Sequence, residues 1–370
     1  MERDLIVPRE PLGLNDQSRI FWHKDGSDSA SANEKTILGL SVDDISLPKR
    51  TSASFRDLFL ENYGRVREWC LSENRRGIAL VALGDDSVEG AAFVASKPDT
   101  VATALLGRHT QSDLRFRGDS SVSLRHLVLL VYPRRAVGQR QRYRLLDLRT
   151  AEGFIDERGK RLRAIDADGP AFIRCGHHTL LFFPVEENDS GWPETAEAGW
   201  EQIPERLYVD EVETEAKPPD WEKNSDRAWE ADELPLLTKD PTLVHSVAGP
   251  EIAVDSLLAV GEEALGELHI ASPRGGATVV VGRTAARAGI LLGRSRRCDA
   301  GRVLLERTIS RVHLLVIEIA GTLYAIDTAS LNGTFSRDGR ERVAPLDGSS
   351  SLSLGDFAVL DFQPSPPRDA

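Results

Sequence analysis

The spacing of hydrophobic positions changes near residue 75. Before it, from about 55 to 74, apolar side chains recur at intervals of three and four, which predicts an amphipathic helix. This stripe consists of Phe55, Leu58, Phe59, Tyr63, Val66 and Trp69. After it, short apolar runs alternate with Gly, Asp and Pro, which is typical of strands; the clearest runs are 78–81, 101–106, 127–132 and 180–183. The same texture returns from about 265 to 362 and predicts β-sandwiches or barrels.

These changes divide the chain into five parts. Residues 1–75 form an N-terminal segment that is irregular and then contains one helix. A first β-domain covers 76–185, an acidic linker covers 186–264, a second β-domain covers 265–364, and 365–370 form a tail. The predicted fold class is therefore mainly β, with two sandwich domains joined by a linker.

Charge is concentrated in the linker. The formal net charge is −12, and the stretch 186–233 alone holds 17 acidic residues against four basic ones, so the rest of the chain is close to neutral. Four of the six tryptophans also lie there, at Trp192, Trp200, Trp221 and Trp229. Because large rings gain free energy by burial, we expect parts of the linker to dock on a folded surface.

Cysteine usage and hydropathy predict a cytoplasmic protein. Cys70, Cys175 and Cys298 are odd in number and more than a hundred residues apart, which argues against a disulfide framework. The longest apolar stretch is far shorter than the ~18 residues of a spanning helix. The amino terminus shows no basic region followed by an apolar run, so we predict no secretory signal and no membrane partner.

The two β-regions repeat one pattern. Leu105 to Arg108 matches Leu291 to Arg294, and Ser123-Leu124-Arg125-His126 matches Ser310-Arg311-Val312-His313. Further along, Asp147 precedes Gly153 by six residues, just as Asp327 precedes Gly333. Four matching features in one order predict two copies of a single domain.

The second copy carries three motifs: Gly293-Arg294, Ser310-x-x-His313, and Ser330-Leu331-Asn332-Gly333-Thr334. In this order and spacing they resemble the signature of the forkhead-associated (FHA) domain family, over about 100 residues of the chain. The resemblance implies an FHA-type β-sandwich that binds phosphothreonine peptides and catalyses nothing. It departs from the family at Leu331, where a polar residue is common. By resemblance, this departure implies the loss of one peptide contact and an altered peptide preference, without loss of binding.

Four residues are the candidates for binding the phosphopeptide. The guanidinium of Arg294 suits a phosphate, the hydroxyl of Ser310 can donate to a phosphate oxygen, and Arg311 adds a second cation. Asn332 can bond the peptide backbone beside the phosphoresidue. By resemblance, Gly293, His313, Gly333 and Thr334 support the site. Each has a plainer interpretation alone, such as a surface charge for Arg294 or a hairpin turn at Asn332-Gly333, so the combination carries the assignment.

The first copy keeps Arg108, Ser123 and His126 but has Leu124 where the second cation stands and Glu152 where Asn332 stands. A carboxylate repels a ligand whose charge is about −1.5 to −2. We interpret this copy as a degenerate FHA-like domain without phosphothreonine binding. The alternative is a weak second site that uses Arg108 and Ser123.

The first copy is nevertheless basic, with 14 basic and six acidic residues between 107 and 163. The run 134–142 contains four arginines and is expected in a loop. Aromatic residues interleaved for base stacking are missing, which argues against nucleic acid. We favour an electrostatic contact between this basic run and the acidic linker.

No phosphate-binding loop, kinase signature, nucleophile elbow or dinucleotide fingerprint occurs in the sequence. The nearest metal-like cluster, Cys175-Gly176-His177-His178, lacks a second ligand pair and fits an ordinary turn. We therefore expect no enzymatic activity, no cofactor and no metal.

The favoured function is a non-enzymatic phosphothreonine-binding adaptor in Ser/Thr kinase signalling or assembly control, in a cell with a GC-rich bacterial genome. Its partners would be a threonine-phosphorylated protein and an upstream Ser/Thr kinase. The ligand could also be a phosphorylated segment of this chain, at Thr51, Thr195 or Thr214. The alternative is a structural scaffold or assembly subunit, for example of a secretion system, that uses FHA folds without recognising phosphate.

Overall fold

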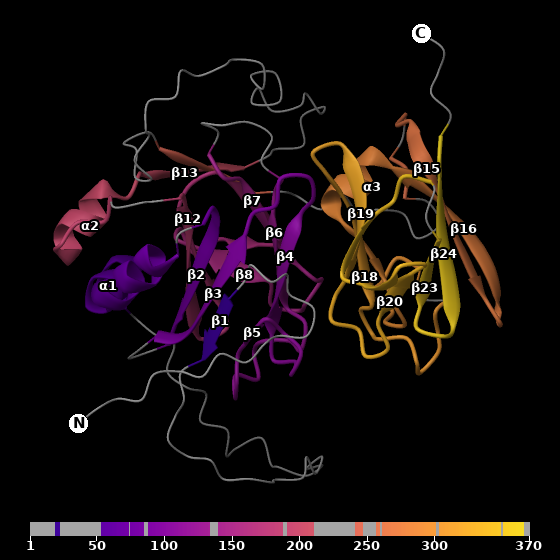
Figure 1. The fold of residues 1–370 in the computed structure, drawn as a ribbon, viewed down its shortest axis with the longest axis horizontal. Helices are drawn as coiled ribbons and strands as arrows, with labels where there is room; N and C mark the ends of the chain where they lie inside the picture. Colours follow the sequence, from indigo (N-terminus) through magenta and orange to yellow (C-terminus); the bar gives the residue numbers. More distant parts are fainter. Residues whose placement is uncertain are drawn as a thin grey trace.

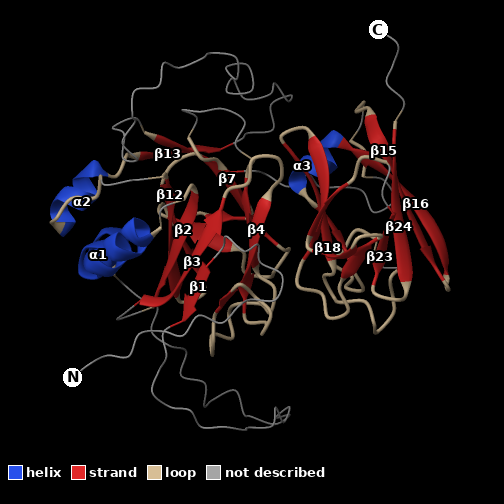
Figure 2. Cartoon of the chain, in the orientation of Figure 1, coloured by secondary structure: helices blue, strands red, loops and turns tan. Residues whose placement is uncertain are grey.

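The computed structural model describes residues 19–22, 53–73, 75–84, 88–133, 140–187, 191–210, 241–246, 257–259, 261–300, 303–348 and 351–365. The fold is mainly β, as expected from the sequence, and Figure 2 shows few helices beside many strands. None of the helices in these ranges is long and apolar enough to cross a membrane.

The first sandwich consists of two seven-stranded sheets, which we call sheets A and B. Sheet A has, in spatial order, β1 (Arg19–Trp22), β3 (Val88–Ala95), β2 (Gly77–Leu83), β12 (His178–Val185), β11 (Ala171–Cys175), β8 (Phe154–Asp156) and β9 (Arg161–Leu162). Sheet B has β13 (Arg206–Asp210), β14 (Thr242–Ser246), β10 (Ala164–Ala167), β7 (Tyr143–Asp147), β6 (Leu127–Val131), β4 (Ala102–Gly107) and β5 (Leu114–Arg115). Parallel pairs join β13 to β14 and β4 to β5, and the other pairs are antiparallel.

The second sandwich is built from sheets C and D. Sheet C has, in spatial order, β16 (Gly275–Gly282), β15 (Ala264–Ser272), β24 (Ala358–Pro364), β23 (Ser351–Leu354), β20 (Thr334–Ser336) and β21 (Gly339–Glu341). Sheet D has β17 (Ile290–Leu292), β18 (Leu314–Ile319), β19 (Thr322–Asp327) and β22 (Val343–Pro345). A short helix, α3 (Arg283–Ala288), connects β16 to β17.

The strand order confirms the internal repeat. In sheet A the order β3-β2-β12-β11-β8-β9 has the same sequence of connections as β16-β15-β24-β23-β20-β21 in sheet C. In sheet B the run β10-β7-β6-β4 corresponds in the same way to β22-β19-β18-β17 in sheet D. The two copies therefore share one topology, and residues at equivalent positions can be compared directly.

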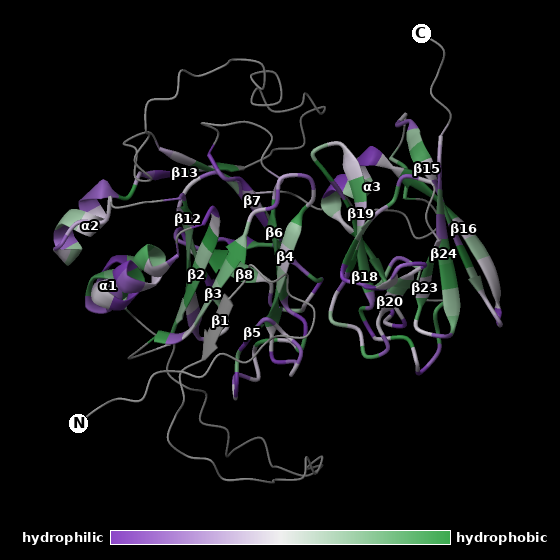
Figure 3. Cartoon of the chain, viewed as in Figure 1, coloured by the Kyte–Doolittle hydropathy of each residue, from purple (hydrophilic) through white to green (hydrophobic). Residues whose placement is uncertain are grey.

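Layers of structure follow one another from α1 (Phe55–Ser72) through sheets A, B and D to sheet C (Figure 1). Each sandwich has its own apolar core between its two sheets, and Figure 3 shows the hydrophobic residues along these strands. The outer faces of sheets B and D also pack against each other, with Leu105, Leu130, Leu291 and Leu315 buried between them. The molecule is thus two sandwiches joined by a third apolar layer.

The expected amphipathic helix is α1. Ser54 caps it, because its hydroxyl accepts a hydrogen bond from the Asp57 amide at 3.1 Å. Leu58, Phe59 and Val66 on its apolar stripe are buried against the outer face of sheet A. Burial of this stripe stabilises a helix that would be marginal alone.

Part of the acidic segment packs on the first sandwich. Trp192 and Trp200 contact the same cluster as α1, and α2 (Ala196–Gln202) lies beside that helix. Strands β13 and β14 extend sheet B at its edge. Trp221, Trp229 and the arginines of 134–135 lie outside the described residues, so the proposed contact between the basic run and the acidic linker remains a prediction.

Candidate functional site

A buried carboxylate organises the loop that carries Asn332. Asp327 at the end of β19 accepts hydrogen bonds from the Ser330 amide at 2.6 Å, the Ser330 hydroxyl at 2.5 Å and the Thr334 hydroxyl at 2.7 Å. All three donors come from the same turn, and buried polar groups are costly unless they are bonded. We call residues 328–332 the recognition loop; Asp327 fixes its path.

His313 joins the recognition loop to the loop before β18. Its Nδ1 accepts from the Ser310 amide at 3.4 Å, so its Nε2 carries the proton and donates to the Gly333 carbonyl at 3.1 Å. Burial lowers the pKa of His313, against the opposing effect of Asp327. The residue is therefore held neutral in one tautomer and links the two loops, while its support of a binding site stays a prediction.

Two glycines are required at the site, Gly333 by its left-handed backbone and Gly293 by a close backbone approach. Gly333 has a φ of 79°, and a Cβ there would lie 2.8 Å from Nε of Arg340. At Gly293 a Cβ would lie 2.5 Å from the Arg311 carbonyl oxygen. This leaves room for the Arg294 amide to donate to the Ser310 carbonyl at 3.1 Å. Arg294 and Ser310 are thereby brought side by side.

The four candidate binding residues surround this backbone junction. The hydroxyl oxygen of Ser310 accepts from the Leu331 amide at 3.0 Å, which leaves its proton free to donate to a ligand. The side-chain amide nitrogen (Nδ2) of Asn332 donates to the Thr308 carbonyl at 2.7 Å. This bond orients the side chain and leaves its Oδ1 oxygen free to accept from a ligand. Arg294 and Arg311 are exposed, and neither side chain has a hydrogen bond or ion pair within the described part of the chain.

Leu331, the position that departs from the family pattern, has a side chain 67% exposed to solvent. Only its amide takes part in the site, through Ser310. The residue can therefore keep the loop in shape without supplying a polar contact of its own, and its side chain is available to an apolar group of a ligand.

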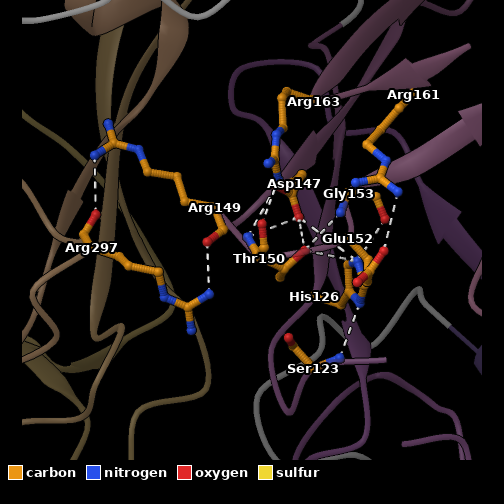
Figure 4. Close-up of polar contacts among 10 residues, drawn as sticks. All are labelled: Ser123, His126, Asp147, Arg149, Thr150, Glu152, Gly153, Arg161, Arg163 and Arg297. Atoms are coloured by element: carbon orange, nitrogen blue, oxygen red, sulfur yellow. Dashed lines mark hydrogen bonds and ion pairs between the residues drawn. The ribbon is translucent and has the colours of Figure 1, made fainter. Parts of the chain in front are cut away.

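The first copy keeps the scaffold and differs in the functional groups. His126 repeats the pattern of His313, accepting from the Ser123 amide at 3.0 Å and donating to the Gly153 carbonyl at 2.8 Å (Figure 4). Arg108, however, donates to the Val122 carbonyl at 2.5 Å and is half-buried. Glu152 forms an exposed ion pair with Arg161 at 3.3 Å. Its carboxylate occupies the position of Asn332.

The structure adds residues that motif reasoning did not assign to the site. Asp327 served only as a marker of the repeat, although a buried Asp three residues before a Ser is the pattern of a turn closed by side-chain hydrogen bonds. Thr308 contributes only a carbonyl, so no side-chain signal could reveal it. Arg125 lies in the first copy, and its contact with the second copy depends on how the two pack.

The expected turn at Cys175-Gly176-His177-His178 joins β11 to β12. Cys175 is buried, and His178 stacks on Phe116 with 4.4 Å between ring centroids. Within the ranges that the structure describes, no group of three or more His, Cys, Asp or Glu side chains is placed to hold a metal ion.

Comparison with solved structures finds FHA domains. The FHA-1 domain of Rv1747 from Mycobacterium tuberculosis matches with 28% identity, covering 28% of this chain and 100% of that domain, at a TM-score of 0.23. The FhaA FHA domain, solved in complex with the intracellular domain of Rv3910, matches with 19% identity, covering 26% and 97%, at 0.22. The yeast Dun1 FHA domain, in complex with a doubly phosphorylated peptide derived from Rad53, matches with 24% identity, covering 30% and 83%, at 0.23.

The chain matches no model of a known protein family and no curated protein. The covered shares of this chain correspond in length to about one of its two sandwiches. These matches are FHA domains, the family that the motifs of the second copy resemble. The two β-sandwiches themselves are seen directly in the strand order and cores of this chain.

Proposed function

We propose that the second sandwich binds a phosphothreonine peptide and that the chain is a non-enzymatic adaptor. The observation that carries the proposal is a pair of exposed guanidinium groups beside Ser310. The Arg294 amide bonds the Ser310 carbonyl, Arg311 follows Ser310 in the chain, and neither side chain has a bonded partner in the described residues. A phosphate bound there would receive two charge-assisted bonds and one hydroxyl bond. Asn332 would bond the backbone of the peptide.

The charges of the site favour an anion. The backbone that holds Arg294 and Arg311 is already bonded, through Arg294 N to Ser310 O and Ser295 N to Arg311 O at 2.9 Å. Both side chains therefore extend from fixed backbone positions, and only their own torsions have to be ordered when a ligand binds. Two cations on adjoining, bonded backbone segments suit a phosphate, which has a charge of about −1.5 to −2 near neutral pH.

Binding rather than catalysis fits the state of the ionisable groups. His313 is the obvious candidate for a general base, yet both of its ring nitrogens are engaged by Ser310 and Gly333. Asp327 accepts three hydrogen bonds from Ser330 and Thr334. A base needs a free lone pair directed at a substrate, whereas both groups are buried and bonded to the loop that they hold.

The partner would be a threonine-phosphorylated protein, modified by a Ser/Thr kinase, or a phosphorylated segment of this chain. Of the three threonines suggested by the sequence, Thr195 is described, and its hydroxyl accepts from the Ala198 amide at the start of α2 at 3.4 Å. Phosphorylation at a helix N-terminus adds charge where the helix dipole favours it. Thr51 and Thr214 lie outside the described residues.

A scaffold function is the second candidate, and the apolar layer between the sandwiches favours it. Leu130, Leu315 and Ile317 are buried where sheets B and D meet. An FHA sandwich is used here as a packing surface, which a structural assembly subunit would also require.

An oriented phosphothreonine-peptide library separates the two functions. For an adaptor, the wild-type chain binds selected phosphopeptides, the unphosphorylated forms do not compete, and Arg294→Ala loses the binding. If the wild type binds no phosphopeptide although the chain is folded, the scaffold function replaces the adaptor.

A further inference from the structure

An arginine of the first sandwich holds the recognition loop of the second. Arg125 precedes β6, and its Nε donates to the Thr328 carbonyl at 2.6 Å while its Nη2 donates to the Ala329 carbonyl at 2.5 Å. A guanidinium presents its donors in a rigid fork, so two adjacent carbonyls are fixed at once. The contact spans the interface between the two copies and ends three residues before Asn332.

The rest of the recognition loop is held from within the second sandwich. Asp327 binds Ser330, and Ser310 binds the Leu331 amide. For the carbonyls of Thr328 and Ala329, Arg125 is the bonding partner in the described part of the chain. Ala329 also has a φ of 56°, in the left-handed region that a residue with a Cβ rarely adopts. Arg125 therefore acts at the strained point of the loop.

The first copy receives the same kind of contact in return. Arg149 stands where Ala329 stands in the second copy and has a φ of 54°. Its carbonyl accepts from Nη1 of Arg297 at 2.8 Å, and its own guanidinium donates to the Arg297 carbonyl at 3.2 Å (Figure 4). The Arg149 guanidinium also donates, through Nη1, to the Asp299 carboxylate at 2.7 Å. Each copy thus fixes the left-handed residue of the other, using arginines from non-equivalent loops.

The charge of Arg125 bears on the proposed site as well. Burial lowers the pKa of Arg125, while Asp327 opposes this and the positive charge of Arg311 adds to it. An arginine stays charged under such shifts. Arg125 consequently contributes positive potential beside Arg311, in addition to its bonds with the loop.

Resting on the proposed function, we propose that Arg125 is a positioning residue for phosphopeptide recognition. It belongs to the sandwich whose own site is degenerate, and it fixes the loop that presents Asn332 in the other sandwich. The first copy therefore serves as an intramolecular support for the second, and peptide affinity depends on the interface between them.

The test uses the full chain with three substitutions: Arg125→Met, Arg125→Lys and Arg149→Met. The probe is a fluorescent copy of the phosphothreonine peptide that binds the wild type best in the library. Arg125→Met should weaken binding about tenfold, mainly by faster dissociation, because two charge-assisted bonds to the loop are lost. Arg125→Lys, which keeps the charge and one donor, should fall between Arg125→Met and the wild type.

Arg149→Met is the matched control, because it breaks bonds across the same interface without touching the recognition loop. The affinity of Arg149→Met for the peptide should stay within about twofold of the wild-type value, although its Tm should change about as much as that of Arg125→Met. Equal losses for Arg125→Met and Arg149→Met would overturn the proposal, since they would reflect general weakening of the interface.

Hydrogen exchange without peptide separates this proposal from the proposed function. Exchange of the amides of 328–333 should accelerate about tenfold in Arg125→Met and remain unchanged in Arg149→Met. If the wild type binds no phosphopeptide, the proposed function fails, whereas the exchange result still decides whether Arg125 positions the loop. Unchanged exchange in Arg125→Met overturns the positioning role. Should that variant fail to fold, the same two measurements on Arg125→Lys decide it, with about threefold effects expected.

Discussion

Arg294 and Arg108 occupy the same position in two copies of one fold, and within the described residues only the Arg108 side chain is hydrogen-bonded. The Nε of Arg108 donates to the Val122 carbonyl at 2.5 Å, whereas the side chain of Arg294 is exposed without such a bond in the described chain. A guanidinium already satisfied by a carbonyl has fewer donors left for a phosphate. The pair gives the chain its own internal control.

Ser310→Ala should weaken phosphopeptide binding by about tenfold or more. The substitution removes a hydroxyl donor to the phosphate and also the acceptor of the Leu331 amide, which is then left without its partner. Titration calorimetry with the selected peptide measures the loss. Ser123→Ala, at the equivalent position of the first copy, should leave the affinity unchanged, and an equal effect of both substitutions would contradict the assignment of the site.

Asp327→Asn should lower the free energy of unfolding by about 2–4 kcal/mol, because a buried charged acceptor of three hydrogen bonds is replaced by a group that must also place two donors. Urea denaturation measures the change. Asp338→Asn, on an exposed turn, should change the stability by less than about 0.5 kcal/mol. A stability loss no larger than that of Asp338→Asn would show that Asp327 does not organise the loop.

The two scaffold histidines should make the fold sensitive to acid. Burial lowers the pKa of both His126 and His313, so the unfolded chain binds more protons than the folded one near their ordinary pKa of about 6.5. Stability is then fully present above that pH and is lost as the pH falls toward the lowered pKa values of the folded state. Protonation would also place a proton on Nδ1, opposite the Ser310 amide.

Urea denaturation at pH 7.5 and pH 5.5, together with proton chemical shifts of the two imidazole rings, measures this dependence. We expect a lower midpoint at pH 5.5 and ring signals that remain those of the neutral form below pH 6.5. Rings that titrate at their ordinary pKa would contradict the buried neutral tautomer.

Leu315→Ala should destabilise the chain by about 2–5 kcal/mol, since the side chain is fully buried between sheets B and D and its loss leaves a cavity. Leu331→Ala removes a leucine that is 67% exposed and should cost little stability. Thermal unfolding compares the two. Equal Tm values for the two variants would show that the layer between the sandwiches contributes little.

The fold class and the repeat could be predicted because both are local signals. Helix α1 follows from the spacing of Phe55 to Val66, and the repeated motifs at Arg108 and Arg294 fixed the relation between the copies before any strand order was known. The candidate side chains could also be named, since Ser310 and Asn332 belong to short motifs. Their bonds to Leu331 and Thr308 could not, because those partners are backbone groups.

The contacts between the copies were beyond sequence reasoning. Leu105 and Leu315 alternate with core residues on strands buried on both faces, so the run of apolar residues does not say which face meets a second sandwich. The contact of Arg125 with the second copy could not be predicted from the sequence for a similar reason. In sequence it is one of many basic residues in the first copy, and its bonds to Thr328 and Ala329 arise only from the packing of the two sheets.

The most direct test of the account compares Arg294→Ala with Arg108→Ala in titration calorimetry against the selected phosphothreonine peptide. Arg294→Ala should lose about 30-fold or more in affinity, because one of the two charge-assisted contacts to the phosphate is removed, while Arg108→Ala should bind as the wild type does. Neither the wild type nor either variant should bind the unphosphorylated peptide. Wild-type affinity in Arg294→Ala, or an equal loss in Arg108→Ala, would contradict phosphate recognition by the second sandwich.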